Sequence, residues 1–178
     1  MTQKKRTEIV ASGFGGQGVV RLGQIIGEAG VKKGLRVTML KSHGTEMRGG
    51  YVRSQVVLSD EGIDSPNAET PDFLITLSKA AYKQFKHMVP DHGLLLYDPG
   101  FVDEIDDTLK CTQKALPARD LSNEKFGKPM FANSIVLGAL AGQIDLLDRD
   151  VVLESMLEII PKFQDLNKEA FNIGYNYL

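Results

Sequence analysis

Glycines dominate the segment Gly13-Phe14-Gly15-Gly16-Gln17-Gly18, which separates an apolar run, Thr7 to Ser12, from a helix-like run, Val19 to Lys33. Glycines at such a junction let the backbone turn sharply off a strand and approach a ligand closely, and the free amides of the following helix attract an anion. The pattern predicts a phosphate-binding turn for an anionic cofactor. The alternative is that the glycines only allow tight packing between strand and helix.

A second candidate is the loop His43 to Gly50, which carries Glu46, Arg48, Gly49 and Gly50. It joins two predicted strands at the side of the sheet where open α/β folds bind ligands. The Arg48 guanidinium offers a rigid fork for a phosphate or carboxylate, and the two glycines let the backbone pass close to a partner. Arg48 is therefore a candidate for contact with a ligand or another subunit. The alternative is an internal ion pair with Glu46.

A nicotinamide cofactor requires more than the glycine turn, because dinucleotide sites place Asp or Glu at the end of the second strand to hold the ribose hydroxyls. Here that strand ends in Lys41-Ser42-His43. The missing carboxylate argues against NAD, although Lys41 suits a phosphorylated ribose or another polyphosphate. A stand-alone nucleotide-binding oxidoreductase and a small regulatory binding module stay open as alternatives.

The elements that must position these residues follow the alternation of an open α/β sheet. After the glycine turn, Leu22 to Ala29 has helical spacing, and Gly34 is placed to end that helix. A further helix is predicted over 79–88, and strands are predicted over 7–12, 35–40, 51–59, 73–77, 94–97 and 109–115. The alternation of apolar and polar residues in 51–59 is typical of a half-exposed strand, which we place at an edge.

Beyond residue 115 the pattern is helical only. Asn133 is expected to cap or anchor the helix that contains Val136 and Leu140, and Asp148 to cap the next one. A third helix is predicted over 166–177, and Leu121, Phe126 and Met130 are expected to lie over the sheet. The fold class is therefore α/β: a Rossmann-like open, mostly parallel sheet with helices on both faces and a helical C-terminal third.

Composition narrows the class of protein. With 178 residues, 42% of them hydrophobic and 25% charged, we expect one domain over 1–178. A net charge of -2 gives no field that would recruit nucleic acid, and no apolar stretch is long enough to span a membrane, so we expect a cytoplasmic protein. The single Cys111 cannot form an internal disulfide or hold an iron-sulfur cluster, and the three histidines show no metal-ligand spacing.

An ordered series of motifs resembles the gamma subunit of 2-oxoacid:ferredoxin oxidoreductases over nearly the whole chain. Gln17 after paired glycines and Arg48-Gly49-Gly50 are the most discriminating matches, since a generic dinucleotide fold requires neither. The series continues through the Leu58-Ser59-Asp60 strand end, Ser65-Pro66, Asp72 to Ile75, Asp98, Asn133 to Gly138, and Asn172 to Gly174.

The resemblance implies a multi-subunit enzyme that decarboxylates a 2-oxoacid on thiamine diphosphate, releases an acyl-CoA and reduces ferredoxin or a similar acceptor. Alpha and beta partners would hold thiamine diphosphate and its magnesium, and the iron-sulfur clusters would belong to beta or to a delta subunit. This chain would hold no catalytic residue and no metal. Whether the isolated chain forms a homodimer that covers exposed interface stays open.

For this chain the resemblance leaves two roles open: docking of coenzyme A, or a purely structural contact with the alpha and beta chains. The residues expected to contact coenzyme A are Gly13, Gly15, Gly16, Gln17, Gly18, Arg48, Gly49, Gly50 and Asn133. Among substrates, 2-oxoglutarate is favoured, and pyruvate, branched-chain 2-oxoacids and indolepyruvate are the alternatives.

Overall fold

A computed structural model describes residues 6–43 and 51–178 of the chain. Within them, six strands form one sheet in the order β2-β3-β1-β4-β5-β6. The strands are β1 (Arg6–Phe14), β2 (Arg36–His43), β3 (Tyr51–Ser59), β4 (Phe73–Thr76), β5 (Leu94–Tyr97) and β6 (Thr112–Ala115). Strands β1, β4, β5 and β6 run parallel, whereas β3 is antiparallel to both β1 and β2. The predicted open, mostly parallel α/β sheet is confirmed.

The prediction that residues 51–59 form an edge strand is wrong. Strand β3 lies between β1 and β2, and it is buried from Ser54 to Ser59. Its polar side chains are paired inside the protein: Ser54 Oγ donates to Val19 O (2.9 Å), and Gln55 Oε1 accepts from Ala68 N (3.3 Å). An alternating pattern therefore arose here from polar residues with internal partners, not from a face open to solvent.

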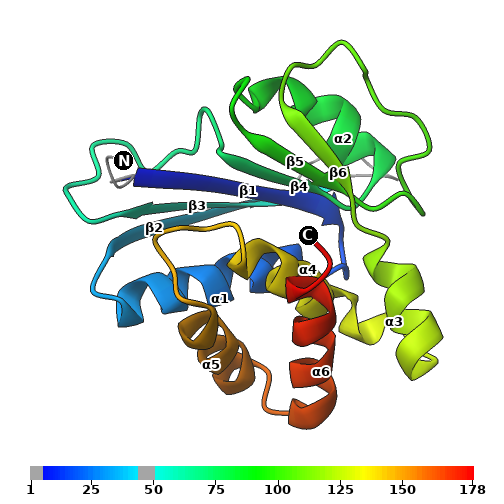
Figure 1. Ribbon diagram of the computed structural model, residues 1–178. Helices are drawn as coiled ribbons and strands as arrows, with labels where there is room; N and C mark the ends of the chain where they lie inside the picture. The colour runs from blue at the N-terminus through cyan, green and yellow to red at the C-terminus, as the bar shows by residue number, and fades with distance from the viewer. Residues whose placement is uncertain (1–5, 44–50) are drawn as a thin grey trace.

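Helices cover both faces of the sheet, as predicted. On one side, α1 (Val19–Lys32) packs against β1, β2 and β3, and α4 (Ala132–Ala141), α5 (Arg149–Ile159) and α6 (Gln164–Tyr175) join it in one hydrophobic core below the sheet in Figure 1. Helix α5 packs on α1, and α6 packs on α4. The other face packs against α2 (Lys79–Phe85), which a short 3-10 turn, η1 (Lys86–Met88), extends. The chain from β6 to its end contains only α3 (Ala118–Phe126), η2 (Pro129–Phe131) and α4 to α6, which confirms the helical C-terminal third.

Helix α1 begins directly at the glycine turn and ends where the sequence predicted. The predicted face is buried, with Leu22, Ile25, Ile26 and Ala29 all 2% exposed or less. At the other end, Gly34 has φ +74° and donates to Val31 O (2.9 Å), and Leu35 N donates to Gly30 O (3.0 Å). This pair of bonds is a Schellman cap, which requires a residue that tolerates the left-handed conformation.

Two expectations about the C-terminal third need correction. Met130 does not lie over the sheet, because 52% of it is exposed, whereas Leu121 and Phe126 do pack against the core. Asp148 precedes α5 as predicted, yet its side chain makes no capping bond. Its carboxylate instead pairs with Lys33 Nζ at 2.5 Å and so ties α5 to the end of α1.

Helices α4 and α6 approach each other through two glycines. A methyl group on Gly138 would lie 1.9 Å from Phe171 O, and one on Gly174 would lie 1.8 Å from Ile135 O. The absence of side chains at these two positions lets the two backbones touch. This contact fixes the C-terminal helix against α4, whose first turn faces the glycine turn.

The segment between β5 and β6 is anchored at Asp106. Its carboxylate accepts from Lys86 Nζ (2.6 Å) and from both the N (3.0 Å) and Oγ1 (2.5 Å) of Thr108. Its main-chain N donates to Tyr82 Oη (2.8 Å), and Gln113 Nε2 donates to its main-chain O (2.8 Å). These bonds attach the segment to α2 and β6.

The donors around Asp106, above all the Lys86 ammonium, hold the pKa of this carboxyl well below its ordinary value. A lowered native pKa stabilises the fold above the unfolded-state pKa of about 4 and ceases to do so as the pH falls through the native value. We expect Asp106→Asn to lower the free energy of unfolding near neutral pH, and this deficit to shrink on acidification. Denaturant unfolding at a series of pH values measures this loss in the free energy of unfolding, and Asp107→Asn, a substitution of the exposed neighbour, is the control. A deficit that stays constant with pH would contradict the prediction.

Candidate functional site

The glycine turn joins the end of β1 to the start of α1 in a conformation that only glycine adopts freely. Gly16 and Gly18 have φ values of +87° and +72°, and Gln17 N donates to Phe14 O at 3.2 Å. A methyl group on Gly15 would meet no atom within 4 Å. The turn therefore exposes backbone and open space at the N-terminus of α1, where the helix dipole favours an anion.

Gln17 organises the turn through its side-chain amide. Its Oε1 accepts from Phe14 N (2.5 Å), and its Nε2 donates to Leu77 O (2.7 Å), directly after β4. Gly13 is buried behind it: a methyl group there would lie 2.4 Å from Gln17 Oε1. Gln17 thus holds the ends of two neighbouring parallel strands together. Direct contact of Gln17 or Gly13 with a ligand stays a prediction.

We expect Gln17→Met, which keeps the length of the side chain but removes both bonds, to lower the free energy of unfolding by about 1–2 kcal/mol. The loss is modest because water can reach part of the turn. Gln24→Met is the matched control, because Gln24 is exposed on α1 beside the same pocket. Chemical denaturation of both variants measures the difference. Equal stabilities would show that the Gln17 bonds do not hold the turn.

Asn133 faces the turn from α4. The residue that caps α4 is Phe131, and its side chain makes no capping bond, so the expected capping role of Asn133 is wrong. Instead, a methyl group on Gly18 would lie 1.9 Å from Asn133 Nδ2. Gly18 therefore lets the Asn133 amide approach the backbone at the start of α1. Within the described part of the chain, this amide has no hydrogen-bond partner.

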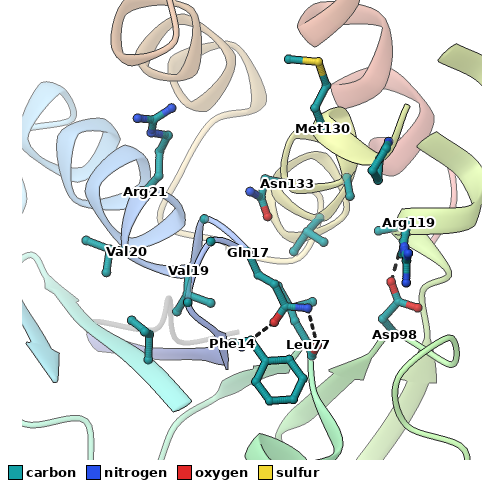
Figure 2. A pocket seen from close by; sticks show the side chains of 18 of the residues that line it. Phe14, Gln17, Val19, Val20, Arg21, Leu77, Asp98, Arg119, Met130 and Asn133 are labelled. Atoms are coloured by element: carbon teal, nitrogen blue, oxygen red, sulfur yellow. Dashed lines mark hydrogen bonds between the residues drawn. The ribbon is translucent and has the colours of Figure 1, made fainter. Parts of the chain in front are cut away.

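A pocket of about 850 Å³ opens at the glycine turn, along the carboxyl ends of β1, β4 and β5 (Figure 2). This volume suits a ligand of coenzyme size. Among the predicted site residues it brings together Gly15, Gly16, Gln17, Gly18 and Asn133. The remaining wall residues are Phe14, Val19, Val20, Arg21, Gln24, Val52, Leu77, Asp98, Phe101, Ala118, Arg119, Pro129, Met130, Ala132 and Val136.

Arg48, Gly49 and Gly50 lie outside the described residues, as does Glu46. The strand that follows that loop, β3, does reach the site. Tyr51 pairs with Phe14, the last residue of β1, and Val52 lines the pocket. Contact of Arg48 with a ligand stays a prediction.

The pocket wall opposite α1 comes from residues that sequence reasoning did not select as binding residues. Asp98 follows β5 and is 2% exposed, Phe101 lies in the next turn, and Arg119 lies in the first turn of α3. Burial raises the pKa of Asp98, and hydrogen bonds from the main chain at Gly100 and Arg119 oppose that rise. The sequence signal for Asp98, Phe101 and Arg119 was their position soon after two predicted strands, because ligands bind at the carboxyl ends of parallel strands.

The described residues show neither a metal centre nor a membrane segment. No three His, Cys, Asp or Glu side chains among them gather closely enough to hold a metal ion. No helix in residues 6–43 and 51–178 has the length and apolar character needed to cross a bilayer.

Comparison with known proteins identifies the family. The family model described as pyruvate ferredoxin/flavodoxin oxidoreductase matches residues 8–177. The chain belongs to this family. Among curated members, the 2-oxoglutarate synthase subunit KorC of Methanocaldococcus jannaschii is 35% identical over 176 residues, which cover 97% of this chain and 94% of that protein.

Two solved structures of the family share the fold. The gamma subunit of a keto/oxoacid ferredoxin oxidoreductase from Geobacter sulfurreducens has a TM-score of 0.84 and 27% identity, over 96% of both chains. The 2-oxoglutarate:ferredoxin oxidoreductase of Magnetococcus marinus, solved with 2-oxoglutarate, coenzyme A and succinyl-CoA bound, has a TM-score of 0.86 and 27% identity. The match covers 97% of this chain but only 31% of the Magnetococcus chain.

These matches confirm the resemblance seen in the sequence. The chain is a gamma-type subunit of a 2-oxoacid:ferredoxin oxidoreductase, an enzyme assembled from several subunits. In the Magnetococcus enzyme the matching region is part of a chain about three times as long. The present chain therefore corresponds to one part of that larger polypeptide.

Proposed function

We propose that the chain is the gamma subunit of a 2-oxoglutarate:ferredoxin oxidoreductase. In this reaction 2-oxoglutarate loses carbon dioxide, its acyl group passes to coenzyme A as succinyl-CoA, and a pair of electrons passes to ferredoxin or a similar acceptor. Support for this substrate comes from two relatives whose names specify 2-oxoglutarate, the KorC subunit and the Magnetococcus enzyme. As the resemblance implies, thiamine diphosphate, magnesium and iron-sulfur clusters belong to partner subunits.

The role proposed for this chain within the complex is docking of coenzyme A. The observation that carries it is the pocket whose base is the turn Gly15 to Gly18 at the N-terminus of α1. Exposed backbone amides and the helix dipole suit the diphosphate of coenzyme A. Apolar walls from Val19, Leu77 and Val136 suit the uncharged parts of a coenzyme. In this arrangement the chain binds and orients the acyl acceptor while partner chains hold the reacting groups.

A substitution at Gly15 tests docking without disturbing the fold. Because a side chain there enters open space at the pocket, Gly15→Val should block the ligand and leave the backbone unchanged. We expect the Kd for coenzyme A and its Michaelis constant in the assembled enzyme to rise at least about tenfold. Gly62→Val is the matched control, since Gly62 also faces open space but does not line the pocket.

The result also separates docking from a structural role. If Gly15→Val prevents association with the larger chains, the turn is a subunit interface. If assembly and coenzyme A affinity both stay unchanged, the turn serves neither role. Arg48→Ala applies the same comparison to the second loop: a raised Michaelis constant with intact assembly supports docking, and a lost complex supports an interface.

The substrate is tested by anaerobic reduction of a viologen dye. The assembled enzyme is offered 2-oxoglutarate, pyruvate, a branched-chain 2-oxoacid and indolepyruvate, each with and without coenzyme A. We expect coenzyme A-dependent reduction with 2-oxoglutarate at the highest kcat/KM. A higher kcat/KM for another 2-oxoacid would reassign the substrate and leave the docking proposal to its own test.

A further inference from the structure

Arg119 carries a charged side chain whose orientation is already fixed at the pocket wall. Its guanidinium carbon lies 5.2 Å from the centre of the Phe101 ring, which it overlies. The Arg119 side chain is exposed, and both residues line the pocket. A guanidinium stacked on a ring keeps the N–H groups at its edge available for hydrogen bonds in its own plane.

Asp98 holds both members of this pair. Its Oδ2 accepts from Arg119 N (3.2 Å), and its Oδ1 accepts from Gly100 N (2.9 Å). Its main-chain O accepts from Phe101 N (3.0 Å). One buried residue therefore joins the turn after β5 to the first turn of α3. Figure 2 shows Asp98 beneath Arg119, on the opposite side of Gln17 and Asn133 from Arg21.

The N–H groups of the Arg119 guanidinium have no partner among the described residues. Arg149 provides the contrast within the same protein. It also overlies two rings, those of Phe171 (5.7 Å) and Tyr175 (5.1 Å), but its N–H groups donate to Asp150 Oδ1 (2.6 Å) and Asn172 Oδ1 (2.5 Å). Arg149 holds α5 against α6, whereas Arg119 lines the pocket and its guanidinium has no acceptor in the described part of the chain.

A planar cation with free, converging N–H groups matches a phosphate monoester, which can accept two parallel bonds. Coenzyme A carries two separate phosphate groups, its diphosphate and the phosphate on the ribose 3′-oxygen. With the diphosphate at the glycine turn, a second anion site on another wall of the same pocket suits the 3′-phosphate. Arg21, on the α1 side, is not stacked on a ring and has no ion pair within the described residues, so its orientation is not fixed in the same way.

We propose that Arg119, stacked on Phe101 and positioned by Asp98, binds the 3′-phosphate of coenzyme A and so selects coenzyme A over its 3′-dephospho form. This inference rests on the proposed docking of coenzyme A in the same pocket. The stack fixes the orientation of the guanidinium before binding, which lowers the entropy lost on complex formation.

The test compares two ligands on the assembled enzyme by equilibrium calorimetry without 2-oxoacid. We expect the parent enzyme to bind coenzyme A about tenfold or more tightly than 3′-dephospho-coenzyme A. Arg119→Gln should weaken coenzyme A to the affinity of the dephospho form and leave the dephospho form unchanged. The control Arg21→Gln should preserve the ratio of the two affinities.

Each other outcome overturns a stated part of the proposal. Equal affinities in the parent enzyme, or an unchanged ratio in Arg119→Gln, would exclude 3′-phosphate binding by Arg119, and loss of the ratio in Arg21→Gln alone would assign it to Arg21. Failure of Arg119→Gln to assemble would place Arg119 in a subunit interface.

Gly15→Val distinguishes failure of the docking proposal from failure of the Arg119 proposal. If Gly15→Val weakens both ligands while Arg119→Gln keeps the ratio of the two affinities, docking stands and only the role of Arg119 fails. If Gly15→Val weakens neither ligand, docking itself fails.

Discussion

Gly174→Ala is expected to lower the free energy of unfolding by at least about 3 kcal/mol, a large part of the roughly 5–15 kcal/mol that stabilises a typical domain. A methyl group there would lie 1.8 Å from Ile135 O, 2.6 Å from Ile135 C and 3.0 Å from Ala139 N. These are main-chain atoms of α4, which cannot rotate aside as a side chain can. Helix α6 must move away as a whole, which opens the core around the fully buried Phe171.

The measurement is chemical denaturation of the purified chain, followed by far-ultraviolet circular dichroism. Gly142→Ala is the matched control at the end of α4, since its methyl group would lie 3.5 Å from the nearest atom, a ring carbon of Tyr175. That is an ordinary contact, and we expect a change within about 1 kcal/mol. A Gly174→Ala protein as stable as the control would mean that the two helices are not held at backbone contact.

Asp98→Ala is expected to lower the free energy of unfolding by about 2–4 kcal/mol and also to weaken coenzyme A binding. Truncation removes a buried carboxylate, and the main-chain N–H groups of Gly100 and Arg119, which are partly buried in these bonds, lose their acceptor. A hydrogen bond to a charged acceptor contributes about 1.5–3 kcal/mol, and water that reaches the two partly buried donors offsets part of their loss. The segment after β5 and the start of α3 then lose their common anchor, and with it the fixed position of Arg119.

Asp103→Ala is the control in the same segment. Its carboxylate pairs with Lys79 Nζ at 2.6 Å, but both side chains are largely exposed, so its removal should change the free energy of unfolding far less than Asp98→Ala does. Denaturation of both variants, with calorimetry of coenzyme A on the assembled enzymes, gives the two readouts. If Asp98→Ala loses stability but binds coenzyme A normally, Asp98 supports the fold without positioning the pocket wall.

The order and type of most elements followed from residue spacing alone. Helical spacing of Leu22, Ile25, Ile26 and Ala29 gave the buried face of α1, and Gly34 gave its end, because both are local properties of the chain. The direction of a strand and the identity of its neighbours depend on residues that are distant in the sequence. Strand β3 was misplaced at an edge because its polar residues, such as Ser54 and Gln55, find partners in α1 and in the 60–72 loop.

In the candidate site, too, local features were predictable from the sequence, and features that depend on tertiary packing were not. The glycine turn was recognisable because φ values of +87° and +72° at Gly16 and Gly18 demand glycine. Asn133 was found, but its role was misread as a cap because its proximity to Gly18 depends on how α4 packs beside α1. Arg119 was missed because stacking on Phe101 depends on two segments that only the sheet brings together.

The position of β1 in the sheet has a consequence for biosynthesis. Strand β1 leaves the ribosome before the other strands of this sheet, yet it is almost entirely buried, and both of its neighbours, β3 and β4, are encoded later in the chain. Its apolar residues Ile9 and Val10 have no antiparallel partner until Val56 and Gln55 of β3 have been translated. Translation therefore exposes an aggregation-prone segment for the time needed to add about 45 residues. Nascent chains stalled before β3 should accordingly be the species that chaperones retain longest.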